Sequence, residues 1–218
     1  MKKKKRTRLS LSFEEKLNRD LVLASNPVLI HGLALAPVIA ASVSLKNALI
    51  LSLAAFILII PTRFIGDLFV GIVPFRLRPM FYSFISALLF IPTIIAVDHI
   101  FGVSVVAVGI YLPMLVVDNI VLSRAEIPSR EGPLEALRNG ILTSIGLSLV
   151  LIIVGAVREF LDTGKLYGIE LLKSGGPLAI AGTTAGGFIL VALLAALFQY
   201  SINMYKRWRY KGARDNVR

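Results

Sequence analysis

Residues 48–73 read ALILSLAAFILIIPTRFIGDLFVGIV, an apolar run of the length that crosses a lipid bilayer. The chain as a whole is also strongly apolar, because 56% of its 218 residues are hydrophobic and its mean hydropathy is +0.78. A water-soluble domain does not need so much apolar surface to fill its core, so the excess must face lipid. We therefore predict a single all-α integral membrane domain and no separate soluble domain.

Six apolar segments follow one another along the chain, and each is interpreted as a transmembrane segment. They cover residues 27–43, 48–73, 80–97, 103–122, 141–157 and 179–204. The sequence thus divides into a basic tail (1–25), a six-helix membrane domain (26–204) and a second basic tail (205–218). In the first tail an apolar residue recurs every four positions from Leu9 to Leu21, which favours a short amphipathic helix on the membrane surface. The alternative is a solvated tail.

The basic residues predict the orientation of the segments. If the N-terminus is cytoplasmic, most of the 24 Lys and Arg residues lie inside. The exceptions on the outer side are Lys46, Arg158, Lys165 and Lys173. By the positive-inside rule, we predict that both termini are cytoplasmic. We expect a multi-pass protein of a bacterial or archaeal plasma membrane. The net charge of +11 gathers at the two chain ends, where we expect it to meet anionic membrane lipid and not nucleic acid.

The first and fourth segments differ from ordinary lipid-facing helices. Both contain proline and polar side chains: Pro27, His31 and Pro37 in the first, and Pro113, Asp118 and Asn119 in the fourth. Proline removes a backbone donor, and polar groups in hydrocarbon are costly unless they face protein or water. We predict that both segments are broken or re-entrant. Since they open the two sets of three segments, the pattern indicates two inverted three-helix repeats around a midplane site.

These broken segments resemble a known family. The stretches Asn26-Pro-Val-Leu-Ile-His-Gly-Leu-Ala-Leu-Ala-Pro37 and Pro113-Met-Leu-Val-Val-Asp-Asn-Ile-Val-Leu-Ser-Arg-Ala-Glu126 are similar to the first and fourth spans of the Rnf and Nqr membrane-subunit family, in the branch of RnfE and NqrD. Asn47-Ala-Leu and Gly155-Ala-Val-Arg-Glu-Phe160 extend the resemblance over nearly the whole chain. It implies six helices in two inverted halves with broken first helices, and pairing with a related sister subunit of opposite orientation.

The metal ligands of that family are missing here. In the family, one cysteine in each half helps to hold a [2Fe-2S] cluster between the paired subunits, and the matching positions are Ala36 and Asn119. The chain has no cysteine, and neither a methyl group nor an amide replaces a thiolate. We therefore expect no cofactor and no metal in this chain.

Asp118 is a second difference from the family that this chain resembles, because related subunits usually carry a neutral polar residue at this position. A carboxylate in a membrane segment is by default a candidate for handling protons or cations, and we predict an ion or substrate path along Asp118, Asn119 and His31. In the alternative interpretation, Asp118 caps a broken helix or pairs with an arginine.

Structural roles are expected for the prolines and for charged pairs near helix ends. They are Pro27, Pro37, Pro113, Arg124 with Glu126, Arg158 with Glu159, and Arg63 with Asp67. The Gly182-Thr-Thr-Ala-Gly186 pattern predicts close helix packing in the last segment.

No phosphate loop, nucleophile triad or metal-ligand cluster is found, so no catalytic residue is predicted. One hypothesis is a membrane subunit of an Rnf- or Nqr-type ion-translocating electron transport complex, without its own iron–sulfur cluster and at most a non-catalytic part of a translocase. A second is a cysteine-free paralogue that works as a small transporter or channel. A membrane anchor without turnover is the third.

Overall fold

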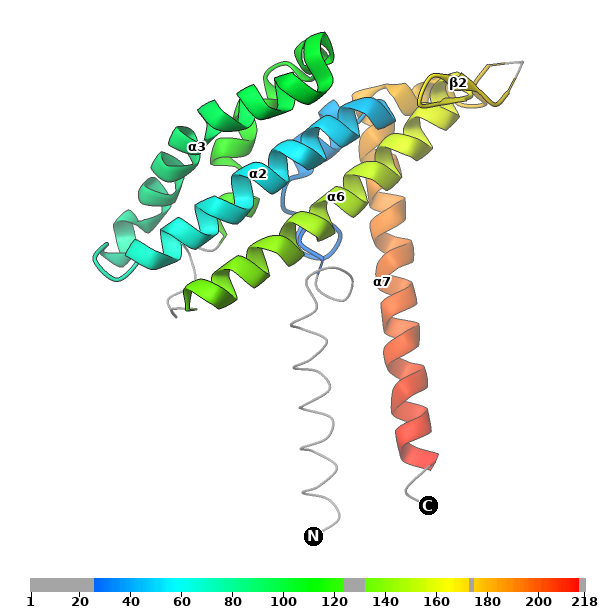
Figure 1. Cartoon of the computed structure of the whole chain (residues 1–218). Coiled ribbons are helices and arrows are strands. Elements are labelled where there is room, and N and C mark those ends of the chain that lie inside the picture. Colours follow the sequence, from blue (N-terminus) through cyan, green and yellow to red (C-terminus); the bar gives the residue numbers. More distant parts are fainter. Residues whose placement is uncertain (1–25, 124–131, 173–174, 216–218) are drawn as a thin grey trace.

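The computed structural model describes residues 26–123, 132–172 and 175–215 (Figure 1). Four helices in this part are long and apolar enough to cross a membrane. They are α2 (Leu45–Phe69), α3 (Arg78–Phe101), α6 (Pro133–Thr163) and α7 (Thr184–Asp215), the last of which is apolar over Thr184–Met204. These correspond to the second, third, fifth and sixth apolar segments. The prediction of a mostly helical chain with long apolar helices is confirmed.

The rest of the described chain forms short elements. They are η1 (Pro37–Ala41), η2 (Phe75–Leu77), η3 (Gly102–Val108), α4 (Tyr111–Met114), η4 (Leu115–Val117), α5 (Asn119–Leu122), the strands β1 (Lys165–Leu166) and β2 (Ile169–Glu170), and η5 (Ala179–Gly182). The first and fourth apolar segments both belong to this group. Each is interrupted, as their prolines and polar residues predicted.

Helices α2, α3 and α6 lie side by side as one layer, with α2 in the middle and antiparallel to both neighbours (Figure 1). The fourth segment packs against α2 and α3. Helix α7 contacts mainly η5 and η1, and then leaves the layer at a steep angle (Figure 1). The antiparallel hairpin of β1 and β2 follows the end of α6, with Lys165 opposite Glu170 and Leu166 opposite Ile169.

Small residues on α6 allow the close contact with α2. A Cβ atom on Gly155 would lie 2.7 Å from Ala48 Cβ, and one on Gly140 would lie 3.4 Å from Ile60 Cα. Ser144 and Ser148 continue this row between the two glycines and are buried. Small residues spaced by four let helix backbones approach closely in a membrane protein.

The predicted GxxxG contact in the last segment is wrong. Gly182 ends η5 and Gly186 lies in the first turn of α7, so the two glycines do not share a helix. A Cβ on Gly186 would overlap the Ile180 carbonyl of the same chain segment. The two glycines therefore do not form one GxxxG face, although Gly182 by itself lies close to the Asp162 carboxylate of α6.

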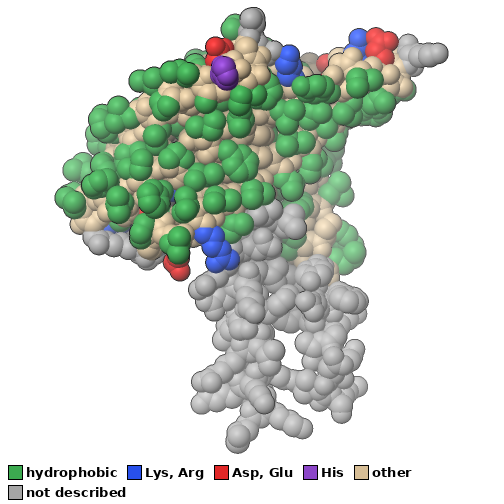
Figure 2. Space-filling model, viewed as in Figure 1, with side chains coloured by type: hydrophobic (Ala, Val, Ile, Leu, Met, Phe, Trp, Pro, Cys, Tyr) green, Lys and Arg blue, Asp and Glu red, His purple; other side chains and the backbone are tan. Residues whose placement is uncertain are grey.

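The outer surface of the helices is strongly apolar. On α3, Phe84, Leu88, Ile91 and Ile95 are all more than half exposed and repeat at helical spacing. Figure 2 shows hydrophobic side chains covering this face, with acidic, basic and histidine side chains at its upper and lower rims. An apolar face of this size needs an apolar environment, which lipid provides.

Two helix boundaries differ from the apolar segments. Helix α6 begins at Pro133 and not near residue 141, because its first turns carry the charged residues Glu135 and Arg138. Helix α7 continues to Asp215, into the stretch expected to be a basic tail. The amphipathic helix expected within residues 1–25, and the anchoring pair Arg124 and Glu126, lie outside the described residues.

Candidate functional site

The first apolar segment begins with Asn26, which is fully buried. Its Oδ1 atom accepts the backbone N–H groups of Val28 (2.9 Å) and Leu29 (3.2 Å), as a helix N-cap does. Its Nδ2 atom donates to the Gly146 carbonyl of α6 at 3.0 Å. Asn26 therefore starts a helical turn and fixes that turn to the centre of α6.

This turn ends within a few residues. Gly32 (φ 66°) and Ala34 (φ 56°) have left-handed backbones, which no α-helix contains. The conformation is unfavourable for alanine, and Ala34 is buried among neighbours that hold it there. Pro37 then opens η1, where its missing N–H group is not needed.

The fourth segment is interrupted at Asp118. Pro113 lies inside the short helix α4, and the chain becomes extended only at Asp118 (φ −68°, ψ 145°). The Asp118 Oδ1 atom accepts the Ile120 N–H group at 3.0 Å and thereby caps α5. The cap is one of the two roles that the sequence left open for this carboxylate.

Asp118 also joins the two broken segments. The backbone of Ala34 in the first segment lies close to this carboxylate. The residue with the strained backbone in one broken segment therefore lies beside the acid of the other. Ala34 and Asp118 thus belong to the first and fourth apolar segments, which the sequence predicted to be broken.

The other predicted site residues differ in exposure. Ala36 is half-buried just before η1, and Pro27 and Pro37 are buried. His31, Asn119 and Pro113 are exposed on this chain alone. A path along Asp118, Asn119 and His31 stays a prediction. Among the described residues, no three His, Cys, Asp or Glu side chains come together as a metal-binding group.

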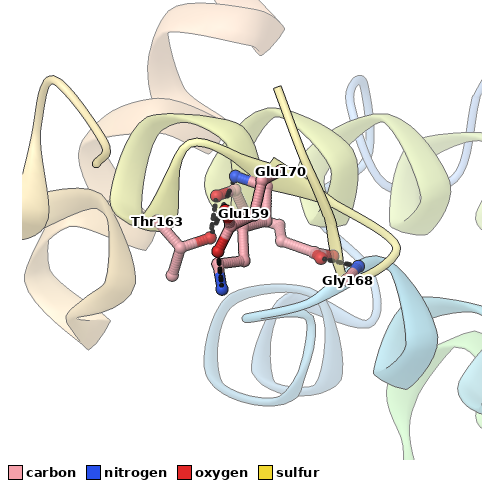
Figure 3. A network of polar contacts seen from close by, with 5 residues as sticks. Glu159, Thr163, Gly168 and Glu170 are labelled. Carbon is pink, nitrogen blue, oxygen red and sulfur yellow. Dashed lines mark hydrogen bonds and ion pairs between the residues drawn. The ribbon is translucent and has the colours of Figure 1, made fainter. Parts of the chain in front are cut away.

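A second polar centre lies at the far end of α6, and the sequence did not identify it as a site. Glu159 is almost fully buried, with its Oε2 atom accepting the Leu45 N–H group at 2.7 Å and its Oε1 atom the Gly168 N–H group at 3.1 Å. Its main-chain oxygen accepts the Thr163 hydroxyl at 2.8 Å. Figure 3 shows Glu159 between Thr163 and the hairpin turn at Gly168. One carboxylate thus connects α6, the start of α2 and the hairpin.

The hairpin has an exposed ion pair, with Lys165 Nζ 2.8 Å from Glu170 Oε1. The hydrogen bond from Lys165, together with its charge, lowers the pKa of the Glu170 carboxyl group. Exposed pairs of this kind contribute little to stability.

Arg158, next to Glu159, is fully buried and points to different partners. Its guanidinium group donates to the backbone carbonyls of Ile39, Ala181, Gly182 and Thr183. Arg158 and Glu159 therefore both anchor the end of α6, as expected, and each does so through its own set of backbone groups. The signal that could have identified them is an Arg-Glu pair interrupting an apolar segment, where burial demands partners for both charges.

The comparisons with known proteins match most of the chain. The family model described as "Rnf-Nqr subunit, membrane protein" matches residues 16–195. The chain is 31% identical over 189 residues to the RnfE protein of the ion-translocating oxidoreductase complex of Shewanella baltica (strain OS185), which covers 79% of this chain and 81% of that protein. The protein of the same name from Vibrio vulnificus (strain YJ016) is 28% identical over 203 residues, covering 86% and 88%.

Proposed function

The chain belongs to the Rnf-Nqr family of membrane protein subunits, and we propose that it is a membrane subunit of an ion-translocating electron transport complex. The names of its relatives, each the RnfE protein of an ion-translocating oxidoreductase complex, support this assignment. The observation that carries the mechanism is the contact of Asp118 with Ala34, because it couples two broken segments through an acid. In this role the chain is a scaffold and gate for Na⁺ or H⁺, and not a catalyst.

We propose that the chain forms two inverted halves, which begin with the broken first and fourth segments. In inverted copies the second helices run in opposite directions, and α2 and α6 are antiparallel. We propose that the membrane domain covers residues 26–204 and lies in the plasma membrane of a bacterium or archaeon. The basic residues outside it support an orientation with both termini in the cytoplasm.

Asp118, Asn119 and His31 are the residues to which we assign the ion path. Since the Asn119 and His31 side chains are exposed on this chain alone, they cannot enclose an ion without further protein. We propose that a related sister subunit of inverted topology covers them. Membrane lipid covers the apolar face of α3.

The family's [2Fe-2S] cluster does not fit the residues of this chain. Its ligand positions carry the half-buried methyl group of Ala36 and the exposed amide of Asn119, and the chain has no thiolate. We therefore assign no electron-transfer step to this chain. Structural roles remain for Pro27, Pro37 and Pro113, and for Arg124 with Glu126.

Purification of the tagged chain from its native membrane in a mild detergent tests the assignment. We expect a membrane protein of the same family and further complex subunits to copurify in fixed ratio, as identified by mass spectrometry. A chain that elutes alone, under conditions that preserve other membrane complexes, would refute the proposal.

The variant Asp118→Asn tests the ion path, because asparagine keeps the helix cap but removes the charge. In membrane vesicles that contain the complex, we expect redox-driven ²²Na⁺ uptake or acidification to be lost while the protein stays folded. The matched control is Asp98→Asn, an exposed acid near the end of α3, which should behave like the native chain. Unchanged ion movement in Asp118→Asn would remove the carboxylate from the path.

A small transporter or channel is the second candidate, and the absence of cysteine from the whole chain favours it. Released from electron transfer, the broken segments would serve transport directly. Proteoliposomes containing only this chain distinguish the two functions. Ion flux that needs no electron donor supports the transporter, whereas flux that appears only with the complete complex supports the subunit.

A further inference from the structure

The hairpin of β1 and β2 has one charged face and one apolar face. Residues directly opposite in an antiparallel pair point to the same side, and successive residues point to opposite sides. Lys165 and Glu170 therefore share one face, where they form the exposed ion pair. Leu166 and Ile169 share the other face, and Ile169 is 68% exposed. An isoleucine this exposed needs an apolar partner outside the chain.

The apolar face continues beyond the strands. The Leu171 N–H group donates to the Gly164 oxygen at 3.1 Å, so the pairing of the two strands extends by one residue. Leu171 comes two positions after Ile169, which places it on the same face, and it is 59% exposed. We call the side chains of Leu166, Ile169 and Leu171 the hairpin apolar face.

The turn of the hairpin contains a tyrosine with an unfavourable backbone. Tyr167 (φ 54°) and Gly168 (φ 81°) both have left-handed backbones, as a tight two-residue hairpin turn requires. Glycine, asparagine or aspartate adopts this conformation at a lower cost than a bulky aromatic residue. Tyr167 is more than half exposed, so burial does not account for its presence. Tyrosine suits the place where a membrane meets water, because its ring is apolar and its hydroxyl group is polar.

The position of the hairpin along α6 matches the edge of a hydrocarbon layer. The apolar segment 141–157 is centred at Leu149, and Glu159 follows ten positions later, which is about 15 Å along a helix. This distance is about half the thickness of a bilayer's hydrocarbon core. The Gly168 N–H group donates to Glu159 Oε1 at 3.1 Å, so the turn folds back to the level of Glu159 (Figure 3). The turn therefore lies where the apolar core meets the lipid headgroups.

The hairpin projects beyond the helices that carry it (Figure 1). Figure 2 shows basic and acidic side chains along the upper edge of this corner of the molecule. Hydrophobic side chains lie below them and continue onto the apolar surface of the helices (Figure 2). The hairpin thus has the polarity of a membrane surface, with its charges away from the lipid-facing helices and its apolar side chains toward them.

We propose that the hairpin is an interfacial anchor: the hairpin apolar face and the Tyr167 ring insert among the lipid headgroups at the end of α6, while Lys165 and Glu170 stay on the water side. Lipid is the favoured partner because the hairpin apolar face lies at headgroup level and is continuous with the apolar surface of the helices. Glu159 joins the hairpin turn to the start of α2, so the anchor fixes the depth of α2 and α6 in the bilayer. This inference goes beyond the proposed function, since it concerns the position of the chain in the bilayer and not ion movement.

The absence of cysteine from the chain makes a direct test possible. The variants Ile169→Cys and Glu170→Cys each carry one nitroxide spin label, on opposite faces of the same strand, and the full chain is reconstituted in nanodiscs of phosphatidylcholine and phosphatidylglycerol. Electron paramagnetic resonance measures the collisions of each label with oxygen, which concentrates in lipid, and with a water-soluble nickel complex. We expect the ratio of oxygen to nickel collisions to be at least about threefold higher for Ile169→Cys than for Glu170→Cys. Lys165→Cys, on the charged face, should match Glu170→Cys.

Quenching of tryptophan fluorescence provides a second measurement, which needs no label. The variant Tyr167→Trp is made together with Trp208→Phe, so that the chain contains a single tryptophan. Phosphatidylcholine brominated near the headgroup should quench its fluorescence more strongly than phosphatidylcholine brominated near the end of the acyl chain. Equal collision ratios at positions 169 and 170, or no quenching by either lipid, would overturn the proposal. An Ile169→Cys label that is immobile and closed to both oxygen and nickel would indicate contact with protein in place of lipid, and would overturn it as well.

Discussion

Replacement of Glu159 by glutamine should destabilise the chain, although the two side chains have nearly the same shape. The two Glu159 oxygens accept the N–H groups of Leu45 at 2.7 Å and Gly168 at 3.1 Å. A glutamine side chain has one oxygen and one NH₂ group, so it satisfies one of these donors and places its own donor against the other. The change also removes a negative charge from the start of α2.

The size of the effect follows from these contacts. A hydrogen bond to a charged group contributes about 1.5–3 kcal/mol, and a negative charge at a helix N-terminus contributes up to about 2 kcal/mol in a partly buried position. The two contributions overlap at Leu45, so we expect a loss of about 3 kcal/mol in the free energy of unfolding. For a chain of this length each kcal/mol shifts the midpoint by about 2–4 °C, which predicts a fall of roughly 6–12 °C.

Circular dichroism at rising temperature, on chain purified in detergent, measures this fall. The chain has no cysteine, so thiol-reactive dyes cannot report its unfolding. The matched control is Glu170→Gln, the same chemical change at an exposed position of the neighbouring strand. We expect the control to match the native chain within error. Equal midpoints for Glu159→Gln and Glu170→Gln would refute the role given to the Glu159 carboxylate.

Three further outcomes can be checked with the same preparation. Gly155→Ala places a methyl group 2.7 Å from Ala48 Cβ and should cost about 1–3 kcal/mol, whereas Gly132→Ala, with open space around it, should leave the midpoint unchanged. Asp118→Ala removes a helix cap and should cost about 1 kcal/mol, while Asp118→Asn should be close to the native chain; equal losses in both would show that the charge and not the cap matters for stability. Lys165→Met should raise the pKa of Glu170 toward its ordinary value in an NMR titration. Because the folded pKa is lowered, any stability from this pair is present above the ordinary pKa and is lost as the pH falls through the folded value.

The sequence predicted both the long helices and the two interrupted segments. Proline alone, however, does not distinguish an interrupted segment from a continuous helix. Helices α2 and α3 contain Pro61 and Pro92 and continue through both. The interrupted segments combine proline with polar residues and with left-handed glycines, such as Gly32 and Gly109. A neighbouring helix can compensate for one missing N–H group, whereas a reversed backbone torsion ends the helix.

The roles of Arg158 and Glu159 could not be predicted, because their partners are distant in the sequence. Arg158 donates to Ile39, which lies 119 positions away, and Glu159 accepts from Leu45, 114 positions away. The local pattern shows that two buried charges need partners, but only the packing of η1, the start of α2 and η5 against α6 supplies them. The cap at Asp118 is local and was foreseen as one alternative. Its contact with Ala34 depends on the same long-range packing.

The contacts of the first segment with the second half of the chain limit how the first segment can move. The first segment is held at its beginning by the Asn26 bond to Gly146, at its strained centre by Asp118, and at its end by Arg158. All three partners belong to the second half of the chain. A cycle that shifts the first segment must therefore break at least one of these contacts, and the strain at Ala34 favours release at the Asp118 contact. In the proposed ion path, binding or loss of a cation at Asp118 would change the balance between the held and the released segment.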